Sequence, residues 1–177
     1  HYGYNALHWA LNRGFQDAEY ANAVLPALYE LVAPASIDVN TGERLVRIDK
    51  SLSEYFLFQT LTVLFKKCFT HPKRLAMGAF EGKNILDIWE GLPTSIVRAE
   101  RKKRSYLSGV LGRNEVDRDY AYNRALFKRI ATGWYQFNPA LSLRRKIAGE
   151  DTWVPIFQAL NLALVSEFSF SVDGVHL

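Results

Sequence analysis

The sequence of 177 residues has little of the residue types that mark special classes of chain. A single cysteine, Cys68, excludes an intrachain disulfide framework and a cysteine-rich metal site. The 11 glycines and 6 prolines follow no period, which excludes collagen-like and low-complexity chains. Because 49% of the residues are hydrophobic, the chain has enough apolar surface for one folded domain, or for two very small ones.

Long apolar runs are also missing. The longest apolar stretch, Tyr55–Phe65, is interrupted by three polar residues and is about half the length that a membrane-spanning helix needs. The first residues do not combine a basic region with an apolar run, so they do not resemble a signal peptide. We therefore expect a cytoplasmic protein with no membrane segment.

No catalytic motif stands out in the sequence. The four histidines are scattered without a metal-ligand spacing, and there is no glycine-rich phosphate loop. Glu115, Asp117 and Asp119 are close enough in sequence to bind a divalent metal, although acidic residues at this spacing more often begin a helix. We expect no cofactor, no metal and no catalytic residue, and therefore a binding protein rather than an enzyme.

Charge is distributed unevenly along the chain. Residues 93–148 contain 13 basic and 4 acidic residues, whereas residues 1–92 contain 9 basic and 10 acidic residues. A basic block of this kind attracts polyanions or an acidic protein surface, unless it only keeps the surface solvated. The second half of the chain is therefore the first place to look for a ligand.

The N-terminal segment predicts a helical hairpin. A helix is expected over 5–13, ended by Gly14, and a second helix over 17–32, with Asp17 as its N-cap and a kink at Pro26. The residues Gly3-Tyr4-Asn5-Ala6-Leu7-His8-Trp9-Ala10 resemble the Gly-x-Thr-Pro-Leu-His-x-Ala motif of an ankyrin repeat, with Asn5-Ala6 in place of Thr-Pro. The resemblance covers residues 3–40, and at most 3–67. It implies a protein-binding unit in which His8 has a structural role.

Two further elements precede the basic block. β-forming residues on either side of Asn40-Thr41-Gly42 predict a hairpin over 36–50. The next helix, expected over about 52–69, is apolar on most of its faces, which is typical of a helix buried in a core. The first half is therefore expected to end in a central buried helix.

In the basic block, aromatic residues alternate with positive charge. We expect helices over 94–111 and 117–131, then a strand over 134–138 that begins after Gly133. This order resembles a winged helix-turn-helix within residues 94–146, and the resemblance implies that 117–131 is the recognition helix. Asn and Arg side chains on such a helix read base edges, and Lys and Arg bind phosphates. The candidate nucleic-acid or anion-binding residues are Arg98, Arg101, Lys102, Lys103, Arg104, Arg118, Asn123, Arg124 and Lys128.

The sequence thus predicts an α+β fold, mainly α with a small β component. We expect a helical repeat-like half over 1–84 and a basic α/β half over 85–177, or one continuous domain. A last apolar segment is expected over 154–165, followed by a short strand near Phe168–Val172. The leading functional prediction is a non-enzymatic protein that binds another protein through its first half and an anionic partner through its second. The alternative is a regulator that binds DNA or RNA through the winged helix.

Overall fold

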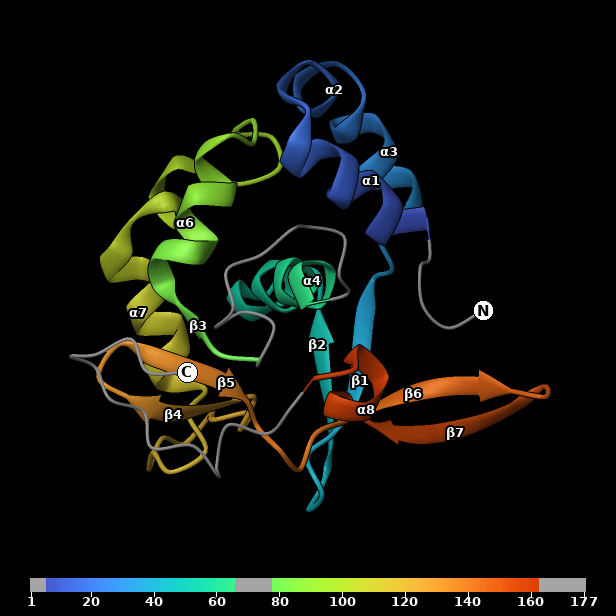
Figure 1. The fold of residues 1–177 in the computed structure, drawn as a ribbon, viewed down its shortest axis with the longest axis vertical. Coiled ribbons are helices and arrows are strands. Elements are labelled where there is room, and N and C mark those ends of the chain that lie inside the picture. The colour runs from blue at the N-terminus through green and yellow to red at the C-terminus, as the bar shows by residue number, and fades with distance from the viewer. Residues whose placement is uncertain (1–5, 66–77, 163–177) are drawn as a thin grey trace.

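The fold is α+β, as the sequence predicts. The computed structural model describes residues 6–65 and 78–162. Of these, 46% lie in helices and 23% in strands, and the strands form two antiparallel sheets (Figure 1). The predicted strand near 168–172, the position of Cys68 and the end of the predicted helix 52–69 lie outside the described residues.

Three helices form the N-terminal unit: α1 (Ala6–Gln16), α2 (Ala18–Ala23) and α3 (Leu25–Val32). Asp17 caps α2, because its side chain accepts a hydrogen bond from the Tyr20 N–H, as predicted. The expected kink at Pro26 appears as a break at Val24, between α2 and α3. The prediction that Gly14 ends α1 is wrong. Gly14 lies inside the helix, where a Cβ atom would stand 2.6 Å from Leu25 Cδ2, so the glycine permits close packing of α1 on α3.

The predicted hairpin is confirmed. β1 (Ser36–Asn40) pairs antiparallel with β2 (Leu45–Asp49). The turn depends on Gly42, whose φ of 91° is in the left-handed region that favours glycine, and on the Asn40 side chain, which accepts a hydrogen bond from the Gly42 N–H. β1 also pairs with β6 (Ser142–Ile147), which pairs with β7 (Glu150–Pro155), so that the sheet has the order β2-β1-β6-β7.

α4 (Ser53–Phe65) is the central helix, and its predicted burial is confirmed. Every residue from Glu54 to Phe65 is buried, and Figure 1 shows the helix end-on between the N-terminal helices and the second half of the chain. Its aromatic residues meet rings from distant elements: Phe56 contacts Tyr29 and Trp89, and Phe58 contacts Phe137. The apolar circumference of α4 is thus explained by packing on several sides.

The second half begins with β3 (Phe80–Glu81) and α6 (Gly82–Glu90). After a short 3-10 helix, η1 (Ala99–Lys102), it continues with α7 (Arg104–Arg113), β4 (Phe127–Ala131) and β5 (Trp134–Phe137). β3, β5 and β4 form a three-stranded antiparallel sheet in that order. The strand predicted over 134–138 is confirmed, whereas the helix expected over 94–111 forms only over η1 and α7.

The helix predicted over 117–131 is wrong. Residues 117–126 form turns and loop, and 127–131 are strand β4, which pairs with β5. Tyr122, which would face the core in a helix over 117–131, is 76% exposed, and Ala125 has a φ of 51°, which a helix does not accommodate. The pairing of Phe127 with Phe137, both fully buried, outweighs the helical spacing of the apolar residues in this segment.

The last described elements are the β6–β7 hairpin and α8 (Ile156–Leu160). The apolar segment expected from Val154 therefore begins at the end of a strand and continues as a helix. Contacts also cross the expected boundary at residues 84/85. β1 pairs with β6, and Glu54 in α4 forms an ion pair with Arg124. The two segments of the chain consequently share one sheet and one ion pair.

Candidate functional site

α7 has one buried face and one exposed face. Leu107, Val110 and Leu111 are buried in the core. The exposed residues of the helix are either charged or small: Arg104, Ser105, Ser108 and Arg113. This division follows from the helical period, since the three apolar residues recur at spacings of three and four. The exposed face therefore combines positive charge at both ends of the helix with short side chains between them.

Two arginines lie across the glycines of α7. A Cβ atom placed on Gly109 would be 3.5 Å from Arg113 Nη1, and one on Gly112 would be 3.7 Å from Arg118 Nη1. The glycines thus leave room for both guanidinium groups against the helix. Arg118 comes from the loop after α7, so the loop adds its charge to the same region.

Other predicted basic residues lie on the elements before and after this helix. Arg98 and Lys103 flank η1 and are exposed, and Arg101 lies in η1 and is half-buried. Lys128 lies on β4, opposite Gln136 of β5, and is also half-buried. We call the set of Arg98, Arg101, Lys103, Arg104, Arg113, Arg118 and Lys128 the basic surface.

The structure gives three of the predicted site residues internal partners. Lys102 Nζ donates a hydrogen bond to the Leu92 carbonyl at 2.5 Å, and Arg124 Nη1 lies 2.5 Å from Glu54 Oε1. Asn123 donates through Nδ2 to the carbonyls of Glu115 and Arg118 and accepts from the Ala125 N–H. Because the predicted recognition helix is absent, Asn123 and Arg124 are not presented on a helix face; they hold the loop 114–126 in place.

The three acidic residues that were considered for a metal site differ in their surroundings. Glu115 Oε2 forms an ion pair with Arg129 at 3.1 Å, and Asp117 and Asp119 are exposed. In residues 6–65 and 78–162, no three His, Cys, Asp or Glu side chains gather closely enough to hold a metal ion. Elsewhere in the molecule, burial raises the pKa of Tyr29 and of Tyr55, which keeps both phenols protonated.

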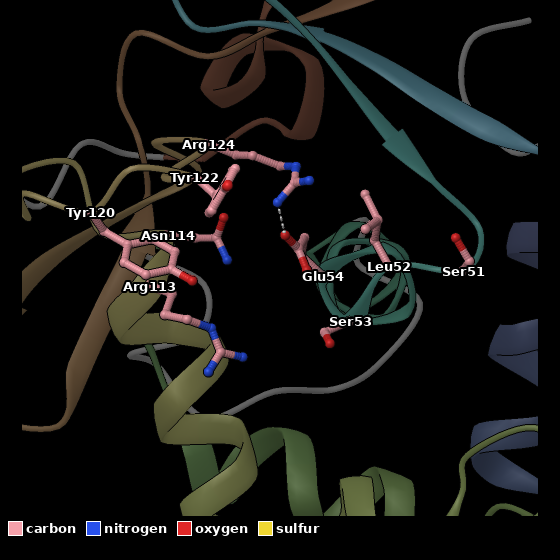
Figure 2. A pocket seen from close by; sticks show the side chains of 9 residues that line it. All are labelled: Ser51, Leu52, Ser53, Glu54, Arg113, Asn114, Tyr120, Tyr122 and Arg124. Atoms are coloured by element: carbon pink, nitrogen blue, oxygen red, sulfur yellow. Dashed lines mark hydrogen bonds and ion pairs between the residues drawn. The ribbon is translucent and has the colours of Figure 1, made fainter.

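A pocket of about 230 Å³ opens between the end of α7 and the start of α4 (Figure 2). Its walls are polar and come from three segments: Ser51, Leu52, Ser53 and Glu54; Arg113 and Asn114; and Tyr120, Tyr122 and Arg124. Figure 2 shows the Glu54–Arg124 ion pair on one side of the pocket and Asn114 on the opposite side. No sequence signal identifies this pocket, because its segments are about 60 residues apart and meet only through the packing of α4 against the second half.

Comparisons with known proteins add no family. No protein-family model matches the chain, and neither a curated protein nor a solved structure is similar enough to count as a match. Within the described part of the chain, no helix has both the length and the apolar character required to cross a bilayer.

Proposed function

We propose that the protein binds duplex DNA through the basic surface, with α7 in the major groove and the β4–β5 hairpin beside it. The order of the elements supports this proposal. Among the described elements, α4, the short strand β3, the helices α6, η1 and α7 and the β4–β5 hairpin come in this order along the chain, and their sheet has the order β3-β5-β4. This arrangement is similar to a winged helix-turn-helix, with α7 instead of residues 117–131 as the recognition helix.

The exposed side of α7 is the single observation that carries the proposal. Its short side chains, Ser105 and Ser108, allow the helix to approach base edges closely, and serine hydroxyls accept or donate hydrogen bonds there. Arg104 precedes Ser105 on the helix and Arg118 Nη1 lies close to Gly112, and guanidinium groups of this kind bind phosphates. The turn at Thr132 and Gly133 is exposed, which suits the tip of a wing.

The experiment measures binding of a short labelled DNA duplex by fluorescence anisotropy between about 50 and 200 mM salt. The test variant combines Arg104→Gln and Arg118→Gln. The control combines Arg13→Gln and Arg47→Gln, which removes the same charge from exposed positions on α1 and β2. We expect the test variant to weaken binding and to reduce the slope of log affinity against log salt by about two units, at about 0.9 per phosphate contact.

Two results would overturn the DNA proposal. One is the lack of any duplex binding by the unmodified protein at about 50 mM salt, where phosphate contacts are strong. The other is an equal loss in the test and control variants, because that result would reflect net charge rather than this surface. The first result would make an acidic protein the favoured partner of the basic surface.

A second candidate function is protein binding by α1–α3. Trp9, Val24 and Leu31 are exposed on these helices, and Leu31 is 81% exposed. Exposed apolar side chains on a helical unit favour a protein contact, in line with the ankyrin-like motif. Photocrosslinking from position 31 in cells, with position 43 in the β1–β2 turn as control, tests this function. A protein adduct that forms from position 31 alone supports it, and the same adducts from both positions, or none, contradict it.

A further inference from the structure

Asn114 carries an unusual buried oxygen at the pocket. The residue follows α7 and is 3% exposed, and its Nδ2 donates to the Val110 carbonyl at 3.0 Å. Its backbone carbonyl accepts from the Leu126 and Phe127 N–H groups. Its Oδ1, however, is buried without a hydrogen-bond partner. Buried polar atoms are normally paired, but no donor from residues 6–65 or 78–162 reaches this oxygen.

The other walls of the pocket carry both signs of charge. Glu54 is a buried carboxylate in the first turn of α4, and only its Oε1 faces Arg124 in the ion pair. Arg113 is exposed at the edge of the pocket and forms no ion pair with any residue between 6 and 65 or 78 and 162. Figure 2 shows Asn114, Arg113 and Glu54 arranged around the same space. A ligand in this space lies near the Glu54 carboxylate and the Arg113 guanidinium, and Asn114 Oδ1 is buried in the wall of the pocket.

The charges select the chemical class of the ligand. A simple cation is disfavoured by the two arginines, and a simple anion is disfavoured by Glu54 and offers no donor to Asn114. A zwitterion carries both charges, so its positive group can face Glu54 and its negative group can face an arginine. The volume of about 230 Å³ is below the roughly 300–1,000 Å³ of pockets for drug-sized molecules, so the ligand is small.

We propose that this pocket binds a free α-amino acid, independently of whether the protein binds DNA. The ammonium group donates to Asn114 Oδ1 and faces Glu54, and the carboxylate binds Arg113. The side chain of the amino acid lies against Tyr120. Access to the buried oxygen requires movement of the rim, and Tyr120 and Tyr122 are 42% and 76% exposed, so little packing holds them.

The experiment is a calorimetric titration of the unmodified chain, in the absence of DNA, with each of the common L-amino acids. For any amino acid that binds, its methyl ester removes the carboxylate charge and its N-acetyl form removes the ammonium group. The test variant is Arg113→Gln, which changes an exposed side chain and is expected to leave the fold intact. Arg118→Gln is the control, because Arg118 lies next to α7 but does not line the pocket.

We expect at least one amino acid to bind, and both derivatives to bind more weakly. Loss of the charge-assisted contact in Arg113→Gln is expected to lower the affinity about 10- to 100-fold, while Arg118→Gln leaves it unchanged. A second variant, Asn114→Leu, removes the unpaired oxygen and is expected to abolish binding, with circular dichroism to check that it folds. Absence of binding by every amino acid, or equal effects of Arg113→Gln and Arg118→Gln, would overturn the proposal. A failure of DNA binding leaves this result unaffected.

Discussion

The ion pair between Arg124 and Glu54 provides the most informative stability test. The Glu54 side chain is 8% exposed and that of Arg124 is 26% exposed, and Nη1 and Oε1 are 2.5 Å apart. Arg124→Gln removes the guanidinium and leaves a buried carboxylate without its cation. Removing one partner of a fully buried pair costs about 3–5 kcal/mol.

Two features of the structure reduce this cost. Water reaches part of Arg124, so the pair is screened more than a fully buried one. Glu54 also lies in the first turn of α4, where the helix dipole stabilises a negative charge by about 0.3–1 kcal/mol. We therefore expect Arg124→Gln to lower the free energy of unfolding by about 2–3 kcal/mol. Adding Glu54→Gln is expected to recover about 1–2 kcal/mol of that loss, because no unpaired charge then remains.

Urea denaturation of the four proteins in this double-mutant cycle gives the coupling energy directly. Arg47→Gln is the matched control, since its ion pair with Asp38 lies at the surface and its loss is expected to change stability much less. The reasoning fails if Arg124→Gln is no more harmful than the control, or if the two changes are additive. An Arg124→Gln protein of unchanged stability but altered DNA sequence preference would instead restore the base-reading role that the sequence predicted.

Three other predictions concern the fold. Leu61 in α4 is fully buried, so Leu61→Ala is expected to lower the free energy of unfolding by about 2–5 kcal/mol. Urea denaturation measures this change, and an exposed α4 would give a far smaller one. His8 Nε2 lies 3.3 Å from Gln59 Oε1 and 3.4 Å from Thr62 Oγ1. His8→Ala is therefore expected to lower the melting temperature without changing the circular dichroism spectrum. An unchanged melting temperature would contradict a structural role. The hydrogen bond from the Tyr20 N–H, followed by the contact with Arg13, lowers the pKa of Asp17 below its unfolded value. The ionised Asp17 side chain therefore stabilises the protein above its unfolded pKa, and this stabilisation is lost as the pH falls through the folded pKa. The stability difference between the unmodified protein and Asp17→Ala should then disappear in strong acid. A difference that persists there would contradict this assignment.

Local signals in the sequence were sufficient to predict several structural elements correctly. Gly42 marks the turn of a hairpin because few other residues adopt its backbone conformation, and Asp17 marks a helix start because its side chain accepts from a free N–H. The apolar circumference of Tyr55–Phe65 indicated a buried helix because each face needs an apolar neighbour. In all three cases the signal lies within the predicted element itself.

The segment after α7 shows where local signals fail. Tyr122, Leu126 and Ile130 have helical spacing, but Phe127 pairs with a partner in β5 that the spacing cannot identify. The same limit applies to the candidate site. The positive charge of α7 is visible in the sequence, whereas the internal role of Arg124 depends on Glu54, which is about 70 residues away. Only tertiary packing distinguishes a guanidinium that is available to a ligand from one that holds a loop.

The pairing of β1 with β6 has a consequence for the order in which the molecule forms during synthesis. Val39 and Leu143 are partners in this sheet although about 100 residues separate them. At about 5–20 residues per second, a ribosome needs about 5–20 seconds to make the chain between them. If β1 and β2 pair during that interval, the β1 edge has no β6 to cover it, and such an edge is a template for pairing with other nascent chains. Slowing translation between positions 50 and 140 should therefore increase aggregation of this protein. Adding a chaperone that binds nascent chains at the ribosome should suppress that aggregation.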